Sequence, residues 1–387
     1  MEKSFNSSTT SAEQSELLKV LLAHHVVAQA TDLHILSDNS VWCRQRGLMN
    51  EAKSWSGLTD AKGKLQEPHT FISIKETLFG EKPIGFNSRV FRSKNYQVRV
   101  QPVDSINGRK LIFRIQRHDP PLLETIFKDF PKTRELLANA SGLVLFCGAI
   151  GAGKTTTAAS LCAYLASRRS KHIASIEDPV EYVHQSDTLR MTHIQAVFPG
   201  DENPGEPRVE GIMTLRESLR VLRRANIDGL FVGEVRDTET RDECLDFAAT
   251  KEALITTIHA GGLADAVLRF TRPVQGGVDQ ATLRLALAQC LHAIVYVNLA
   301  FNDKGEPQPV FLVLPGQEAS VRSAIADLNP KTLGTQLNAA LQSCSIDKGA
   351  INVNNSARAA KRAGATEDSI KAAFPADMME GLALFAD

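Results

Sequence analysis

The sequence predicts an α/β fold with a mostly parallel sheet, preceded by a small α+β domain. Beyond residue 122, apolar strand-like segments alternate with helical patterns, which is the order that builds a parallel sheet. Before residue 118, short strand-like segments dominate, and two of them are joined by Asn107-Gly108, a favoured hairpin turn. Asp119-Pro120-Pro121 separates the two patterns, and consecutive prolines interrupt regular structure. The chain is therefore expected to form two domains.

The N-terminal domain is predicted over residues 12–117, after a polar tail over residues 1–11 that we expect to be disordered. Its first element is a helix over residues 15–28, because leucines and valines recur there at helical spacing. Strand-like segments follow at Asp32–Leu36, Ser40–Arg44, Ser88–Arg92, Tyr96–Asp104 and Lys110–His118.

The α/β domain is predicted over residues 123–315, after a linker at 118–122. Its expected elements, in order, are a helix at 122–138, a strand at 142–147, a helix at 154–169 and strands at 172–176 and 229–232. The Pro/Gly-rich segment 198–211 predicts a long loop. Residues 316–387 are predicted to be mostly helical, and we expect their removal to spare the chemistry of the domain before them.

Composition narrows the class of protein. Lys and Arg together number 44, as do Asp and Glu, so no overall field attracts nucleic acid or an anionic membrane, and no direct nucleic-acid binding is expected. The six cysteines form no Cys-x-x-Cys pair, which argues against structural zinc and against a disulfide framework. No apolar run approaches the ~20 residues that span a bilayer. We expect a cytoplasmic protein that reaches a membrane only through partners.

One motif carries most of the functional argument. The segment Gly148–Thr155 matches the pattern G-x-x-x-x-G-K-[ST]. It lies between an apolar strand and a helix, which is the context that a phosphate-binding loop requires. Glycines let backbone N–H groups turn toward phosphates, and the helix that follows adds its positive dipole end. Its lysine is expected to reach the β- and γ-phosphates of ATP, and its first threonine to bind Mg²⁺. The predicted nucleotide-binding residues are Gly148, Ala149, Ile150, Gly151, Ala152, Gly153, Lys154, Thr155 and Thr156.

Two further segments supply the carboxylates that such a loop needs. Ile227–Glu234 is an apolar strand that ends in a carboxylate, the form of a Walker B element that holds Mg²⁺. Ser175–Glu181 delivers three carboxylates into a turn after a strand, and one of them can orient the attacking water. Without the upstream loop, acidic residues at the end of a strand would more often be ordinary turn residues.

The residues from about 30 to 297 resemble the ATPases of type II secretion and type IV pilus systems, closest to the pilus-retraction branch. The resemblance rests on five blocks in the family's order. They are Thr31-Asp32-Leu33-His34, the loop at 148–155, an Asp box at 176–184, a Walker B block from Glu217 to Asp237, and a His box at Thr256–His259 with Arg269 beyond it. The resemblance implies a RecA-like P-loop NTPase domain and a PAS-like N-terminal domain.

The resemblance also implies roles for particular residues. Glu177 would activate the attacking water, Glu234 would lie near Mg²⁺, and His259 would sense the γ-phosphate, so the implied catalytic set is Glu177, Glu234, Lys154 and His259. Arg99 and Arg114 match arginines that the family's N-terminal domain closes over the nucleotide. The expected assembly is a homo-hexamer that works with inner-membrane platform proteins and other parts of a secretion apparatus.

Departures from the family's pattern decide between its branches. The cysteine-rich insert of assembly and type II secretion members is missing, and residues after about 297 do not resemble the tail of retraction motors. A motor for type IV secretion or conjugative transfer is therefore preferred, with a pilus-retraction ATPase as the alternative. An assembly scaffold that binds nucleotide without turnover is a further alternative, disfavoured because Glu177, Glu234 and His259 are all present.

Overall fold

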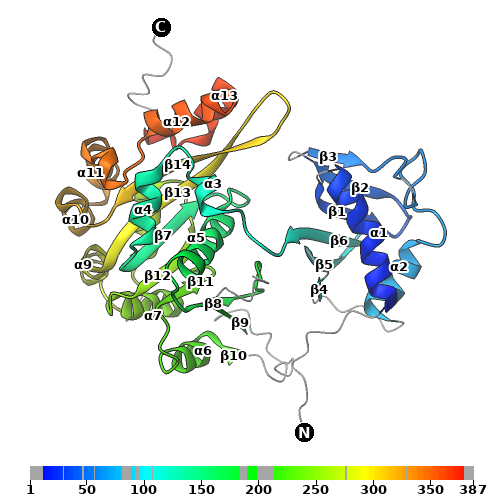
Figure 1. Cartoon of the computed structure of the whole chain (residues 1–387), viewed down its shortest axis with the longest axis horizontal. Coiled ribbons are helices and arrows are strands. Elements are labelled where there is room, and N and C mark those ends of the chain that lie inside the picture. Colours follow the sequence, from blue (N-terminus) through cyan, green and yellow to red (C-terminus); the bar gives the residue numbers. More distant parts are fainter. Residues whose placement is uncertain are drawn as a thin grey trace. The chain divides into compact units, whose positions relative to one another are not determined.

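The computed structural model contains two compact units, Met1–Asp119 and Pro120–Asp387 (Figure 1). It describes residues 12–28, 30–45, 48–55, 57–80, 89–92, 96–106, 108–183, 190–197, 213–274, 277–327 and 329–378. The expected tail at 1–11 and the expected loop at 198–211 lie outside these residues, as does Asn107 of the expected turn. None of the helices in the described ranges combines the length and the apolar character needed to cross a membrane.

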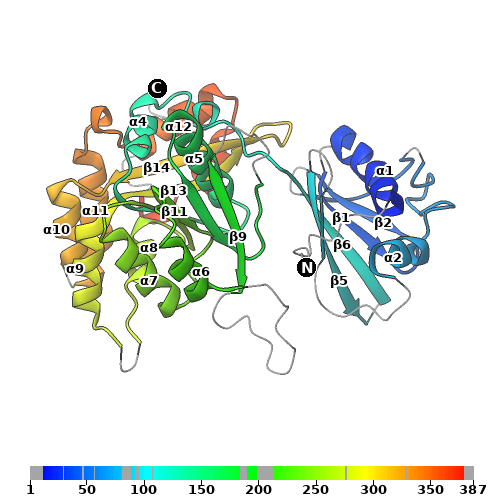
Figure 2. The ribbon, with the colours of Figure 1, turned by 60° about the horizontal axis from the view of Figure 1, so that its bottom comes forward.

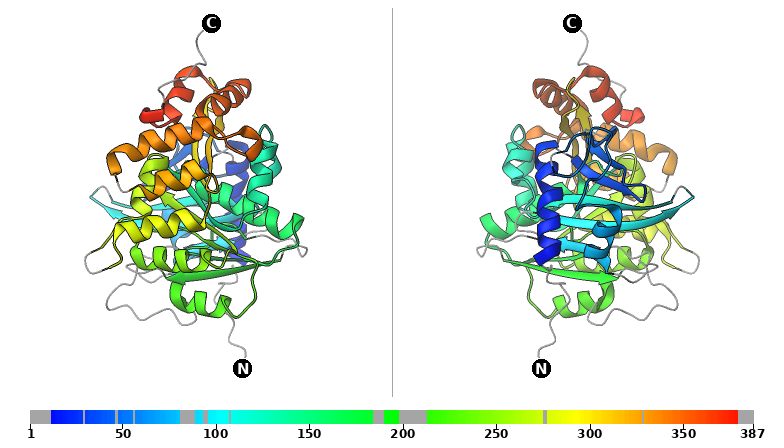
Figure 3. Two further views of the ribbon diagram at one scale, coloured as in Figure 1. Left: turned by 90° about the vertical axis from the view of Figure 1, so that its left-hand side faces the viewer. Right: turned by 90° about the vertical axis from the view of Figure 1, so that its right-hand side faces the viewer.

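The first unit is a six-stranded antiparallel sheet with two helices on one face. The strand order is β3-β2-β1-β6-β5-β4, and the helices α1 and α2 pack on the apolar side (Figure 3). Its elements are α1 (Ala12–Ala28), β1 (Ala30–Leu36), β2 (Val41–Gln45), β3 (Leu48–Glu51), α2 (Phe71–Phe79), β4 (Arg89–Arg92), β5 (Tyr96–Ser105) and β6 (Gly108–Arg117). The predicted α+β class is confirmed, although no sequence pattern indicated α2.

Alternation along the strands of the first unit separates its core from its polar face. Val98 and Val100 on β5 and Phe113 on β6 are buried against the helices. The residues between them, Arg99 and Arg114, are directly opposite each other in the antiparallel register. Because side chains alternate along a strand, both arginines lie on the face away from the core.

The second unit has an eight-stranded sheet in the order β10-β9-β8-β11-β12-β7-β13-β14. All neighbouring pairs are parallel except β13 and β14 at one end. Its strands are β7 (Gly142–Gly148), β8 (Ile173–Glu177), β9 (Met191–Val197), β10 (Met213–Thr214), β11 (Gly229–Val232), β12 (Ala253–His259), β13 (Leu291–Phe301) and β14 (Pro307–Pro315). The central strands β7, β8, β11 and β12 are buried along almost their whole length because helices cover both of their faces. The predicted α/β class with a mostly parallel sheet is confirmed.

Helices lie on both sides of this sheet, with α5 on one side and α6, α7 and α8 on the other (Figure 2). The helices of this part of the chain are α3 (Leu123–Ile126), α4 (Pro131–Ala138), α5 (Lys154–Arg168), α6 (Leu215–Leu222), α7 (Thr238–Ala248), α8 (Leu263–Phe270) and α9 (Gln280–Cys290). The single helix expected over 122–138 is wrong, because the chain forms α3 and α4 instead. Pro131 cannot donate a backbone hydrogen bond, and it begins α4 at a position where none is needed.

The C-terminal helices belong to the same unit as the phosphate-binding loop. They are α10 (Ala319–Ala326), α11 (Pro330–Ser343), α12 (Val353–Arg362) and α13 (Glu367–Ala373), with 3₁₀ turns at Ile346–Lys348 and Ala376–Met378. Leu337 and Ile370 are fully buried in the core that contains β13 and β14. The backbone N–H of Phe311 on β14 donates to the Ser356 hydroxyl at 2.8 Å. Because these helices share a core with β13 and β14, their packing does not fit the expectation that removing residues after 316 spares the chemistry of the domain before them.

Candidate nucleotide-binding and catalytic site

The phosphate-binding loop connects the end of β7 to the start of α5. Gly148 ends the strand with φ at 149°, and a Cβ there would lie 2.2 Å from the carbonyl oxygen of Val297. Gly153 precedes α5 in the left-handed region, with φ at 93°. Both positions therefore require glycine. The resulting turn places backbone N–H groups and the positive end of the α5 dipole at the same point, which is the arrangement that binds phosphate.

Lys154 is the first residue of α5 and is 6% exposed. Its ammonium donates to the carbonyl of Ala149 at 2.7 Å and lies 3.1 Å from Nδ1 of His259. Burial lowers the pKa of Lys154, and the nearby carboxylate of Glu234 opposes that shift. The lysine is thus held at the mouth of the loop by two acceptors that a bound phosphate can replace.

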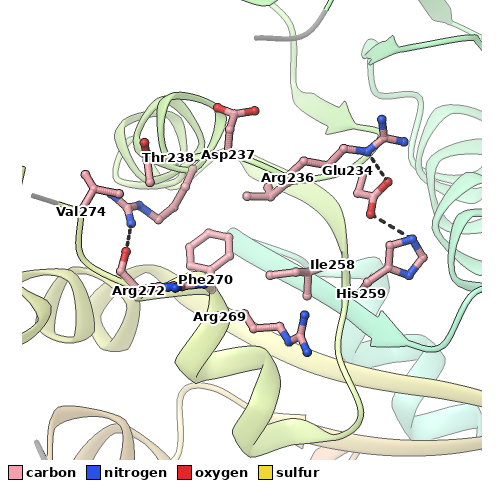
Figure 4. Close-up of a pocket in the computed structure, with 12 residues that line it drawn as sticks. Glu234, Arg236, Asp237, Thr238, Ile258, His259, Arg269, Phe270, Arg272 and Val274 are labelled. Carbon is pink, nitrogen blue, oxygen red and sulfur yellow. Dashed lines mark hydrogen bonds and ion pairs between the residues drawn. The ribbon is translucent and has the colours of Figure 1, made fainter. Parts of the chain in front are cut away.

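His259 and Glu234 extend this contact into a chain of hydrogen-bonded side chains (Figure 4). His259, the last residue of β12, places Nε2 3.0 Å from Oε1 of Glu234. Nε of Arg236 donates to the other oxygen, Oε2, at 2.8 Å. With Nδ1 accepting from Lys154, His259 carries its proton on Nε2 and donates it to Glu234. The order Lys154, His259, Glu234, Arg236 is a continuous hydrogen-bonded series.

Glu177 lies at the end of β8 in a different environment. It is 4% exposed, and burial raises its pKa to about 8. The Ser175 hydroxyl and the backbone N–H of Glu181, 3.3 Å from Oε2, oppose this rise with hydrogen bonds. A carboxyl group with such a pKa is a stronger base than an ordinary carboxylate, which suits it to accept a proton near neutral pH.

The topology of the sheet explains why these residues meet. The strands β8, β11, β12 and β7 are consecutive and parallel, so their carboxyl ends lie at one edge. Ligands of open α/β sheets bind at that edge. Glu177 ends β8, Glu234 follows β11, His259 ends β12 and the loop follows β7. The backbone at Gly233 passes close to Glu177, since a Cβ there would be 3.3 Å from its Cγ.

A pocket of about 340 Å³ opens beside Glu234 and His259. Four arginines line it. Arg236 belongs to the Walker B block and Arg269 follows the His box, whereas Arg241 and Arg272 lie outside the family's blocks that the sequence showed. Each of three guanidinium groups already has a partner. Arg236 contacts Glu234 (Figure 4), Arg241 contacts Asp242 and the carbonyl of Arg272, and Arg269 contacts Asp265. Arg241 and Arg272 come from α7 and the segment after α8, and no local motif marks them.

Of the two arginines predicted in the first unit, Arg114 forms an ion pair within its own sheet. Nε of Arg114 lies 3.2 Å from Oδ1 of Asp32, and the Arg114 side chain is 67% exposed. Asp32 belongs to the block that resembles the family's N-terminal signature, so that block has a structural role in the first unit. Contact of Arg99 and Arg114 with nucleotide stays a prediction.

The residues expected to hold Mg²⁺ are Thr155 and Glu234. Thr155 is the second residue of α5, and its hydroxyl forms no hydrogen bond with the described residues. Within the same ranges, no cluster of three or more His, Cys, Asp or Glu side chains could bind a metal ion. Mg²⁺ in nucleotide sites takes one or two protein ligands, and phosphates and water supply the rest, so a single hydroxyl and a nearby carboxylate fit this cation.

The fold and this edge of the sheet define a P-loop NTPase. Residues 85–300 match the family described as "Type II/IV secretion system protein". The chain belongs to this family, as its sequence predicted.

Relatives and solved structures agree with this assignment. The protein is 31% identical to "Uncharacterized protein YggR" of Escherichia coli over 55% of this chain and 61% of that one. It is 32% identical to "Type IV pilus ATPase PilU" of Pseudomonas aeruginosa over 41% of this chain and 37% of that one. It thus matches less than two thirds of the length of either relative.

Two solved structures share the fold. "X-ray structure of the Legionella pneumophila ATPase DotB" has a TM-score of 0.69 at 18% identity, covering 92% of this chain and 95% of that one. "Crystal Structure of the Pilus Retraction Motor PilT and Bound ADP" has a TM-score of 0.63 at 22% identity, covering 92% and 96%.

Proposed function

We propose that this protein is an ATP-hydrolysing motor of a secretion or pilus apparatus. The observation that carries the proposal is the edge of the parallel sheet where four consecutive strands bring together the phosphate-binding loop, a buried Glu177 and the Lys154–His259–Glu234 series. Names of relatives support it, since PilU and PilT of Pseudomonas aeruginosa are both described as type IV pilus ATPases.

Each group has a defined part in this proposal. Backbone N–H groups from Gly148 to Thr155 and the α5 dipole bind the phosphates of ATP, and the Lys154 ammonium moves from Ala149 and His259 onto the β- and γ-oxygens. Thr155 and Glu234 hold Mg²⁺, which neutralises charge on the phosphates. Departure of Lys154 breaks its contact with His259, so His259 responds to the presence of the terminal phosphate.

Glu177 acts as the general base. Its burial makes the carboxylate basic enough to accept the proton of a water that attacks the γ-phosphate. General-base catalysis of this kind contributes about 10²–10⁴-fold to a rate. Arg99 and Arg114 of the first unit supply positive charge to the phosphates, as the family resemblance implies.

The assembly that we propose is a cytoplasmic homo-hexamer that associates with the inner membrane through platform and other apparatus proteins. Type IV secretion or conjugative transfer is the preferred apparatus, because the cysteine-rich insert is absent and the tail differs from that of retraction motors. Pilus retraction is the second candidate, supported by the 32% identity to PilU.

ATP hydrolysis by the purified full-length chain tests the enzymatic part. We expect Mg²⁺-dependent turnover that Lys154→Ala abolishes together with ATP binding, because the phosphates lose their cation. Glu177→Gln should reduce kcat by about 10²–10⁴-fold and retain ATP binding, because only the proton acceptor is lost. Glu252→Gln is the matched control, since this carboxylate is exposed at the opposite end of β12.

Two results would redirect the proposal. Tight ATP binding without turnover, in the wild-type chain and in the control alike, would favour an assembly scaffold. Deletion of the gene in its native host separates the apparatus candidates, since loss of DNA or effector transfer supports secretion and loss of twitching supports retraction. Light scattering of the ATP-bound protein measures whether the particle has the mass of six chains.

A further inference from the structure

Behind Glu177, on the side away from the phosphate-binding loop, two polar side chains continue the hydrogen bonding from its strand to the next. Ser175 is two residues before Glu177 on β8, so the two side chains lie on the same face of the sheet. In the parallel register, Ser175 is opposite His193 on β9. Its Oγ lies 2.8 Å from Nδ1 of His193. Ser175 is completely buried and therefore connects a buried carboxyl to an imidazole on the neighbouring strand.

The direction of these hydrogen bonds follows from counting protons. A serine hydroxyl has a single proton to donate and two lone pairs that accept. When that proton is donated to the carboxylate of Glu177, the contact with His193 requires a proton on Nδ1 of the imidazole. When Nδ1 is unprotonated, it takes the proton of Ser175 instead, and the carboxylate loses this donor. The protonation of His193 at Nδ1 therefore decides which way the hydroxyl points.

We propose that His193 is a positioning residue for the base Glu177 and acts through the hydroxyl of Ser175. An Nδ1–H on His193 turns the hydroxyl toward Glu177, stabilises the ionised carboxylate and fixes its orientation toward the attacking water. The inference rests on the role proposed for Glu177 in hydrolysis. It gives a role to Ser175 and adds His193, to which no motif pointed.

Among the residues that the structure describes, other groups near this pair come from α5 and from the turn after β8. From α5, which packs on this face, Cys162 lies close enough to feel the charge of Glu177, and Tyr164 packs against the same core. Glu181, in the turn after β8, raises the pKa of Glu177. The charged residues of α6 belong to a helix whose apolar side packs on the opposite face. The exposed pair His172 and Thr192 joins the same two strands at 2.9 Å but does not reach the carboxyl.

A titration of Glu177 in the nucleotide-free, full-length protein tests the inference. The probe is ¹³C NMR of glutamate side-chain carboxyls, with the Glu177 signal assigned by its loss in Glu177→Gln. Ser175→Ala should raise the midpoint by about one pH unit, because the carboxylate loses a hydrogen bond and each unit corresponds to 1.36 kcal/mol. His193→Ala should raise it by a smaller amount, because the hydroxyl remains but loses its fixed direction.

Two further variants separate positioning from packing. His193→Asn can still donate an N–H to Ser175, so it should return the midpoint to the wild-type value. His172→Asn, which changes the neighbouring histidine–hydroxyl pair, should leave it unchanged. Wild-type midpoints in both Ser175→Ala and His193→Ala would overturn the inference.

Kinetics give a second readout. The acidic limb of the kcat profile should shift with the NMR midpoint, while ATP affinity stays constant, because β9 lies on the side of β8 away from β7 and the phosphate-binding loop that follows it. If the protein binds ATP without turnover, the NMR midpoints still decide the inference, and the failure then belongs to the proposed hydrolysis alone.

Discussion

Two carboxylates stand at the ends of neighbouring strands, Glu177 after β8 and Glu234 after β11, yet their environments are opposite. Both oxygens of Glu234 have donors, Nε2 of His259 and Nε of Arg236, and its side chain is 19% exposed. Among the described residues, the donors to Glu177 are neutral, a hydroxyl and a backbone N–H, and the residue is 4% exposed. On neighbouring strands, Glu234 is therefore paired with two donors, whereas burial raises the pKa of Glu177.

The difference shows how one sheet edge provides two kinds of chemistry. A carboxylate that is paired with cationic and N–H donors keeps its charge, which suits it to a place near a metal ion. A carboxyl that has lost its water without gaining a cation binds a proton more strongly, which suits it to general-base catalysis.

The largest expected effect is on the free energy of unfolding, and it comes from the burial of the Glu177 carboxyl. Its folded pKa is about 8 against an ordinary value of 4.5, so the folded protein binds a proton that the unfolded chain releases. Between these values stability falls as pH rises, and above about pH 8 the loss is complete. Glu177→Gln removes this dependence and should be the more stable protein by several degrees at pH 8.5, with little difference at pH 5. Each kcal/mol corresponds to about 2–4 °C in a domain of this size.

Thermal unfolding of the nucleotide-free protein between pH 5 and pH 9 measures this. Glu252→Gln, at an exposed position, should follow the wild-type curve at every pH. A Tm difference between Glu177→Gln and wild type that does not change with pH would show that Glu177 is not the group responsible.

Glu234→Gln should have the next largest effect. A neutral amide cannot balance the charge of Arg236 or accept equally from His259, and the group near Mg²⁺ loses its charge. Groups that act on a metal ion from its surroundings contribute about 10–100-fold to metal affinity or activity, and we expect a loss of kcat/KM in that range. The Mg²⁺ concentration that gives half-maximal rate should rise as well.

A Mg²⁺ titration of the ATPase rate measures both quantities. Glu239→Gln on α7 is a suitable control, since its carboxylate contacts Arg216 and is 43% exposed. A normal Mg²⁺ dependence in Glu234→Gln would contradict a place for this residue near the cation.

Tyr182→Phe tests how the chain after β8 is fixed beside Glu177. The Tyr182 hydroxyl lies 2.8 Å from that of Thr156 on α5, and the tyrosine is 7% exposed. Removal of one buried hydrogen bond of this kind costs about 1 kcal/mol. Chemical denaturation measures the loss, and Tyr164→Phe is the matched control. Tyr164 packs against the core on α5, and its hydroxyl forms no hydrogen bond with the described residues. Equal losses in both variants would show that the hydroxyl contact contributes nothing.

The sequence predicted the parts of this site that depend on local signals. The phosphate-binding loop is one continuous segment whose glycines are required by its own backbone, so a pattern of eight residues locates it. Glu177 and Glu234 follow apolar strands, and parallel pairing then brings them together. The α/β class followed from the same alternation of strands and helices.

Other parts of the site and fold carry no local signal. Strand β9 is polar in composition, with Thr192, His193 and Gln195, because it lies near the edge of the sheet and not in its centre. Arg241 and Arg272 reach one pocket from separate segments, and only tertiary packing joins them. The C-terminal helices contain small and polar residues at many positions, which hid how completely Leu337 and Ile370 are buried.

Arg236→Ala is expected to have the smallest effect and tests whether the pairing of Glu234 depends on both donors. The Arg236 side chain is 56% exposed, and exposed ion pairs contribute about 0–1 kcal/mol. His259 still donates to Glu234 in this variant, so the carboxylate keeps one of its two donors, and we expect a change in kcat of less than about fivefold at physiological salt. The change should shrink further as salt rises, because salt screens exposed pairs. Arg216→Ala, which breaks an equally exposed contact with α7, is the control. A loss as large as that of Glu234→Gln, insensitive to salt, would instead mean that Arg236 contacts the phosphates directly.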